Sequence, residues 1–148
     1  MSTQSERQDL LEKALQAGHE ALNKDDLEKG DLEQAREQFQ AALRIASELR
    51  NESASETAIA GLHKVTLREK AMEDQVAYHD LMATGDRARD NRSWAQAVGE
   101  YKKARDVASR MSDKEQQEAS IQYYLAQGEK SLEAKDYVSA MEFFQQAM

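Results

Sequence analysis

The stretch that decides the fold is GDRARDNRSWAQAVGEYKKARDVA, residues 85–108. It predicts the end of one helix, a tight turn at Asn91–Arg92 and a second helix that starts at Ser93. Ser93 and Gln96 have the spacing of a capping box, in which each side chain satisfies a free backbone N–H of the first helical turn. The second helix then carries one stripe with spacings of four and three residues, which predicts its buried face: Ala97, Tyr101, Ala104.

The same pattern occurs in two further places. Each copy has a cap residue, a bulky residue and then Ala-x-x-x-aromatic-x-x-Ala. One copy consists of Asp31, Leu32, Ala35, Phe39 and Ala42, and the other of Asp136, Tyr137, Ala140, Phe144 and Ala147. Recurrence at a fixed internal spacing indicates a repeat architecture, in which each unit packs on its neighbour.

A glycine precedes two of the copies at the same distance. Gly85 lies twelve residues before Ala97, and Gly128 lies twelve residues before Ala140. On these residues the chain resembles the tetratricopeptide repeat (TPR) family, a helix–turn–helix of roughly 34 residues. The first copy departs from the family because Gly18 lies seventeen residues before its alanine, and the proline usual after the second helix is absent.

The resemblance implies an all-α fold, an α-solenoid of three antiparallel hairpins in which small residues let helices A and B approach closely. We expect a single domain over residues 1–148, with hairpins at about 3–50, 53–111 and 112–148 and with unusually long A helices. Cap signals place the helix starts: Thr3 with Glu6, Asp31, Ser53 with Glu56, Ser93, Ser112 with Glu115, and Asp136. The first helix is expected to end near Leu27.

The segment from 54 to 90 contains no turn signal, which predicts one long helix of roughly 36 residues against a typical length of about 11–12. The alternative is a break near Arg68–Glu73, where a charged run interrupts the apolar spacing.

Composition excludes several classes of function. The formal net charge of −8 disfavours binding to nucleic acid and to anionic membranes, both of which need a basic surface. No apolar run approaches the roughly 20 residues of a membrane helix, and the first residues have no signal-peptide core. The chain has no cysteine, which suggests a reducing compartment. We therefore expect a cytoplasmic protein.

Residues for chemistry are scattered. No two of His19, His63 and His79 have the spacing of metal ligands on one helix, and no nucleophile has a base placed beside it. Carboxylates alternate with Lys and Arg as on an ordinary solvated helix face. The sequence therefore predicts no metal site, no cofactor and no enzymatic activity.

The TPR resemblance implies a concave wall lined by the A helices. Carried over by position, this wall offers Glu20, Lys24, Glu28, His79, Met82, Asp86, Arg89, Gln122, Leu125, Glu129 and Leu132. Such a groove would be mostly acidic with an apolar floor, and would suit a basic or amphipathic peptide. The plainer interpretation is that the acids only keep the protein soluble. Acidic residues after the glycines, Asp86 and Glu129, argue against the carboxylate clamp of chaperone-binding TPR domains.

The C-terminal helix carries a second surface signal in Met141, Phe143, Phe144 and Met148. Repeat stacks normally end in a helix with a polar outer face, and none follows here. Three explanations stay open: the native chain continues beyond Met148, another subunit covers this end, or the aromatic rings fold inward.

The sequence thus favours a non-enzymatic adaptor or scaffold that binds a protein or peptide. The rival is a structural module that self-associates through Phe143, Phe144 and Met148. A third hypothesis is a regulatory domain that holds a small ligand between its hairpins.

Overall fold

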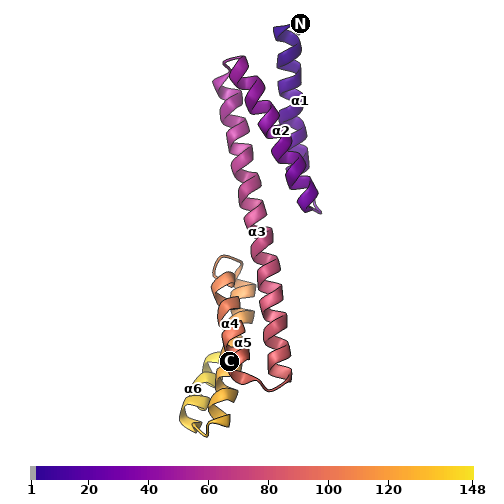
Figure 1. Cartoon of the computed structure of the whole chain (residues 1–148). Coiled ribbons are helices and arrows are strands. Elements are labelled where there is room, and N and C mark those ends of the chain that lie inside the picture. Colours follow the sequence, from indigo (N-terminus) through magenta and orange to yellow (C-terminus); the bar gives the residue numbers. More distant parts are fainter. Residues whose placement is uncertain (1–2) are drawn as a thin grey trace. The chain divides into compact units, whose positions relative to one another are not determined.

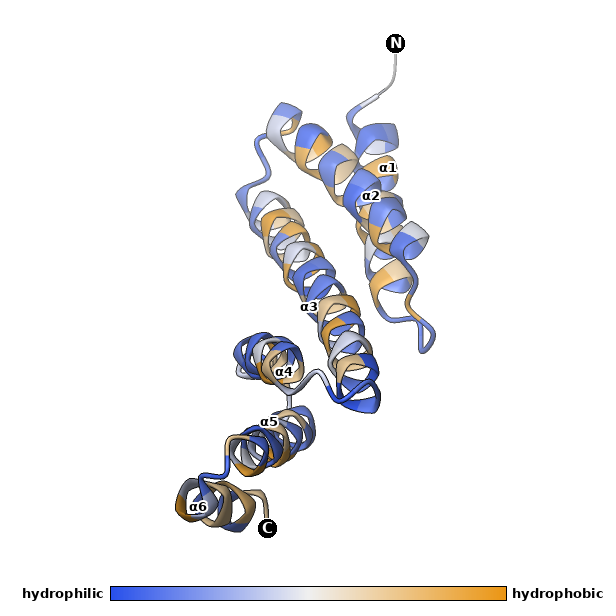
Figure 2. Ribbon diagram, turned by 60° about the horizontal axis from the view of Figure 1, so that its bottom comes forward, coloured by the Kyte–Doolittle hydropathy of each residue, from blue (hydrophilic) through white to orange (hydrophobic). Residues whose placement is uncertain are grey.

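A computed structural model describes residues 3–148, and these residues form an all-α fold without strands. Six helices follow one another along the chain (Figure 1): α1 Gln4–Leu22, α2 Lys29–Glu48, α3 Glu52–Asp90, α4 Trp94–Ala108, α5 Asp113–Glu133 and α6 Tyr137–Ala147. Figure 2 shows hydrophilic and hydrophobic residues alternating around the helices, as expected for amphipathic helices that bury one side. The predicted all-α class is confirmed.

The long helix is also confirmed. α3 contains 39 residues and runs without interruption through Arg68–Glu73, so the alternative with a break there is wrong. Its N-terminus differs from the prediction, because the Asn51 side-chain oxygen accepts the Ala54 N–H at 3.1 Å. Asn51, rather than Ser53, is therefore the residue that caps α3.

Of the other predicted helix caps, some form as expected and others do not. The Thr3–Glu6 box forms, and Asp136 accepts the Ser139 N–H at 3.2 Å. Asp31 was expected to precede α2 but lies within its first turn, where it accepts the Glu28 N–H at 3.0 Å. The extended first helix is likewise wrong, since α1 ends at Leu22, and residues 23–28, which include Leu27, form the connection to α2.

Ser93 and Ser112 occupy the predicted N-cap positions, but neither hydroxyl bonds a backbone N–H of its helix. Ser112 instead donates to the side chain of Glu115. The capping boxes expected at these two serines are therefore not formed.

The chain divides into two compact units, Met1–Lys70 and Ala71–Met148, and α3 contributes residues to both. In the first unit Phe39 of α2 is fully buried, with its ring against glycines of two other helices. A Cβ on Gly18 of α1 would lie 2.8 Å from the Phe39 ring, and one on Gly61 of α3 would lie 2.5 Å from it. Glycine is thus required where these helices approach α2. The predicted stripe of α2 is buried: Ala35, Phe39, Ala42.

The second unit repeats this contact. Tyr101 of α4 lies against Gly85 of α3, and Phe144 of α6 lies against Gly128 of α5, each at 2.5 Å from the position that a glycine Cβ would occupy. The predicted stripe of α4 is confirmed, since all of its members are buried: Ala97, Tyr101, Ala104.

The third copy of the stripe is only partly buried. Ala140 is buried and Phe144 half-buried. Tyr137 belongs to this copy of the stripe and was expected on the buried side, but it is exposed, as is Met141. That expectation is wrong because, within residues 3–148, no further helix follows to cover this side of α6.

The Trp94 hollow, a candidate protein-interaction site

A hollow of about 800 Å³ opens beside the turn between α3 and α4, within the second unit. It is lined by Arg89, Asp90, Arg92, Trp94, Glu129, Leu132 and Glu133. A second hollow of about 600 Å³ adjoins it through Arg92, Trp94 and Glu133, and extends toward Gln96 and Lys130. We call the pair the Trp94 hollow. Arg89, Glu129 and Leu132 were predicted from the sequence as groove residues, and the structure brings them together here.

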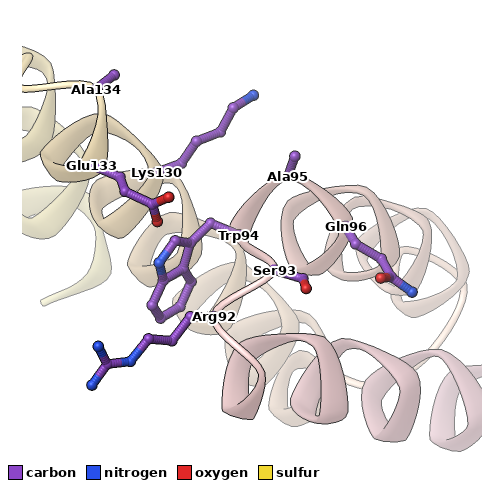
Figure 3. A pocket seen from close by; sticks show the side chains of 8 residues that line it. All are labelled: Arg92, Ser93, Trp94, Ala95, Gln96, Lys130, Glu133 and Ala134. Atoms are coloured by element: carbon purple, nitrogen blue, oxygen red, sulfur yellow. The ribbon is translucent and has the colours of Figure 1, made fainter.

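The turn itself positions Trp94. Arg92 has a φ of 57°, in the left-handed region, and the Ser93 N–H donates to the Ala88 carbonyl at 2.8 Å. This is the geometry with which many helices end, although glycine usually occupies the left-handed position. The turn makes Trp94 the first residue of α4 and places its side chain next to those of Arg92 and Glu133 (Figure 3).

Trp94 was not among the predicted site residues. In the sequence it is only the bulky residue after a cap, at the position that Leu32 and Tyr137 hold in the other two copies of the pattern. The signal that could have found it is that Trp94 is the only tryptophan of the chain, and tryptophan is enriched at interaction sites.

Asp86, also a predicted groove residue, is engaged within the protein. It accepts a hydrogen bond of 2.6 Å from the Tyr101 hydroxyl and lies 3.4 Å from the Arg89 guanidinium. Arg89 also donates to the Gln122 side-chain oxygen of α5 at 3.1 Å. Burial of Tyr101 raises the pKa of its phenol well above the ordinary value, and the hydrogen bond to Asp86 raises it further.

Unlike Asp86, Glu129 accepts no hydrogen bond from the aromatic residue that packs on the glycine of its helix. Both follow the glycine of their helix, but the aromatic residue against Gly128 is Phe144, which has no hydroxyl to donate. In the described part of the chain no hydrogen bond or ion pair involves the Glu129 side chain. This carboxylate can therefore accept a donor from outside the protein.

The remaining predicted residues of the second unit are spread out. His79 is exposed and its ring packs edge-on against Tyr78. Met82 is half-buried and packs against both clusters of buried residues in this unit. Leu125 is partly exposed but does not line the Trp94 hollow. Met82 therefore contributes mainly to the core rather than to a groove floor.

Glu20 and Lys24 belong to the first unit and form local contacts there. Gln16 donates to the Glu20 carboxylate at 3.0 Å, and Lys24 forms an ion pair with Asp31 at 2.7 Å. The hydrogen bond to Asp31 raises the pKa of Lys24. Exposed ion pairs of this kind contribute little to stability.

The predicted self-association residues have different environments. Phe144 is half-buried with its ring on Gly128, and Phe143 is also half-buried, whereas Met148 is almost fully exposed. Inward packing of the ring, one of the three explanations considered for this end, therefore holds for Phe144.

No protein-family model, curated protein or solved structure matches this chain. Within the part of the chain that the structure describes, none of the helices combines the length and the apolar character needed to cross a membrane.

Proposed function

We propose that the chain is a non-enzymatic protein-interaction module built from TPR-like hairpins. The proposal is supported by the glycine–aromatic contact at Gly18 and Phe39, Gly85 and Tyr101, and Gly128 and Phe144. In each case a small residue on one helix lets an aromatic ring of the next helix pack directly on its backbone. Such hairpins form a scaffold whose function depends on its surface.

The binding site is the Trp94 hollow, and its ligand is a basic or amphipathic segment of a partner protein. The observation that carries this proposal is the unpartnered Glu129 carboxylate in the same hollow as the half-buried Trp94. A Lys or Arg side chain can pair with Glu129 and lie over the indole ring, because aromatic faces attract cations. Leu132 then contacts an apolar neighbour of that residue.

Binding can be followed by the fluorescence emission of Trp94, because it is the only tryptophan and lines the proposed site. Titration of the chain with a basic amphipathic peptide should change the Trp94 emission, and Glu129→Lys should weaken binding about tenfold or more. Steering by charge acts mainly on the association rate, so Glu129→Lys should mainly slow association. The difference in affinity from the unmodified chain should shrink as the salt concentration rises.

The matched control is Glu12→Lys, which makes the same change of charge at an exposed position of α1. Equal effects of the two reversals would mean that only net charge matters, and would remove the hollow from the proposed function.

A further inference from the structure

In the second unit, the contacts of α3 and α4 with α5 identify the surface on which α5 packs. The Tyr78 hydroxyl of α3 donates to the Glu118 carboxylate of α5 at 3.0 Å, and Arg89 donates to Gln122. From α4, the Arg105 guanidinium lies 4.6 Å from the centre of the Tyr123 ring. Met82 of α3 and Val98 of α4 pack against the buried cluster that contains Ala126 of α5. Five contacting positions on α3 and α4 can thus be assigned to the surface that binds α5: Tyr78, Met82, Arg89, Val98, Arg105.

The next hairpin repeats these positions in the same register. Gly85 and Gly128 each contact the aromatic residue sixteen places later, so the two hairpins can be aligned on these glycines. The alignment places Ile121, Leu125 and Leu132 of α5 where α3 has Tyr78, Met82 and Arg89. A sixth position is Trp94, which lines the Trp94 hollow together with Leu132 of α5. The alignment places Tyr137 and Met141 of α6, and Met148 directly after this helix, where α4 has Trp94, Val98 and Arg105.

All six aligned residues of the third hairpin are exposed, with exposed fractions from 38% for Leu125 to 98% for Met148. Tyr78, the counterpart of Ile121, is only 2% exposed because α5 covers it. We call these six residues the α5–α6 face. They account for every exposed large hydrophobic residue on α5 and α6 except Val138.

We infer that the α5–α6 face binds an amphipathic helix of a partner protein, laid across α5 and α6 as α5 itself lies across α3 and α4. The inference rests on the proposed function, because it assumes that the chain binds a protein. It adds a second binding surface and states the class of ligand that this surface binds. It also assigns Leu125 to this face, and Leu132 to both this face and the edge of the Trp94 hollow.

The aligned residues indicate what the bound helix must offer. Where the covered face has the polar groups of Tyr78, Arg89 and Arg105, the open face has Ile121, Leu132 and Met148. The ligand therefore needs apolar side chains at the positions where α5 has Glu118 and Gln122, because a polar group buried there would find no partner. A small residue is needed over the Phe144 ring, as Ala126 packs in the cluster that contains Tyr101.

Charge favours a basic partner helix over a second copy of this chain. Residues 113–147 carry seven Asp and Glu against three Lys, so this hairpin is negatively charged, and a second copy would bring another net charge of −8 toward it. Head-to-tail stacking of copies is disfavoured further, because the exposed surface of α1 is mostly polar, with Leu10 as an exposed apolar residue within it: Asp9, Glu12, Lys13, Gln16. The rival prediction of self-association concerns this same end of the molecule, so the test must separate the two.

The probe is a synthetic peptide of residues 112–133 with Glu118→Leu and Gln122→Leu on its contact side and Glu129→Lys and Glu133→Lys to make it basic. Calorimetric titration into the full chain should show saturable one-to-one binding. A second peptide with the additional change Ala126→Trp should not bind, because the ring has no room over Phe144.

Two protein variants locate the site. Met141→Glu should weaken binding of the probe at least tenfold, whereas Val138→Glu, on the same helix and 71% exposed, should change it less than twofold. Both positions are exposed, so both variants should remain folded by circular dichroism.

Absence of binding to the unmodified chain, or equal effects of the two variants, would overturn the inference. Light scattering on the chain alone provides the other decisive outcome: a dimer that Met141→Glu dissociates would make a second copy the occupant and would also overturn it. If a basic peptide still changes the Trp94 emission while this probe fails to bind, the proposed function stands and only this inference is lost.

Discussion

The Tyr101 hydroxyl donates a hydrogen bond of 2.6 Å to the Asp86 carboxylate and so joins α4 to α3 beside the buried Gly85. In the next hairpin the aligned pair is Phe144 and Glu129, which cannot form this bond. The exchange of Tyr for Phe therefore does two things. It removes a link between the two helices, and it leaves Glu129 available at the edge of the Trp94 hollow.

Alkaline pH should weaken the second unit through its buried phenols. Burial raises the pKa of Tyr101 and of Tyr78 well above the ordinary value, and hydrogen bonds to Asp86 and Glu118 add to the effect. The unfolded chain therefore loses these protons first, at about pH 10. The stabilisation is complete below that pH and decreases as the pH rises above it.

Urea unfolding at pH 9 and at pH 11 measures this decrease. Tyr101→Phe should reduce the difference between the two pH values, and should lower the free energy of unfolding at pH 7 by about 0.5–1.5 kcal/mol through the lost hydrogen bond. A variant with the same pH dependence as the unmodified chain would show that Tyr101 does not carry the effect.

Two helical glycines should respond to alanine in opposite ways. At Gly85 the new Cβ would lie 2.5 Å from the Tyr101 ring, so Gly85→Ala should cost about 1–3 kcal/mol of stability. At Gly99 no atom lies within 4 Å of the new Cβ, so Gly99→Ala should stabilise α4 by about 0.5–1 kcal/mol. Shifts of the same sign in thermal unfolding would contradict the assigned close contact.

Two alanines of α4 provide a similar comparison of its faces. Ala97 is fully buried and Ala95 is exposed. Ala97→Leu should therefore overpack the core and cost about 1–3 kcal/mol, while Ala95→Leu should change the stability by less than about 0.5 kcal/mol. The melting temperatures of the two variants test the phase of the helix.

Much of the fold could be predicted because its contacts repeat within short stretches. The Ala-x-x-x-aromatic-x-x-Ala stripes locate the buried side of α2 and α4, and the absence of turn residues predicts the length of α3. Cap identities were less predictable, because several residues near a helix start can compete for the same backbone N–H groups. Asn51 was favoured over Ser53 in this way.

The candidate site was harder to predict because its residues come from three helices. Position along an A helix identifies Arg89 and Glu129, but only the fold shows that the hollow also contains Trp94 from the start of α4. The exposed state of Tyr137 could not be read from its stripe either. The spacing of the stripe is the same as in the covered hairpin, and what differs is whether a further helix lies against it.

If α5 and α6 present, uncovered, the surface that α3 and α4 use to bind α5, aligned positions of the two hairpins should respond differently to the same added charge. The most direct measurement compares Val98→Glu with Met141→Glu, the same change at aligned positions of the two hairpins. Val98 packs against the buried cluster that contains Ala126 of α5, so a charge there should lower the free energy of urea unfolding by about 1–3 kcal/mol. At the exposed Met141 the change should be within about 0.5 kcal/mol. Equal losses of stability at the two positions would show that Met141 does not lie on an uncovered counterpart of the surface that carries Val98.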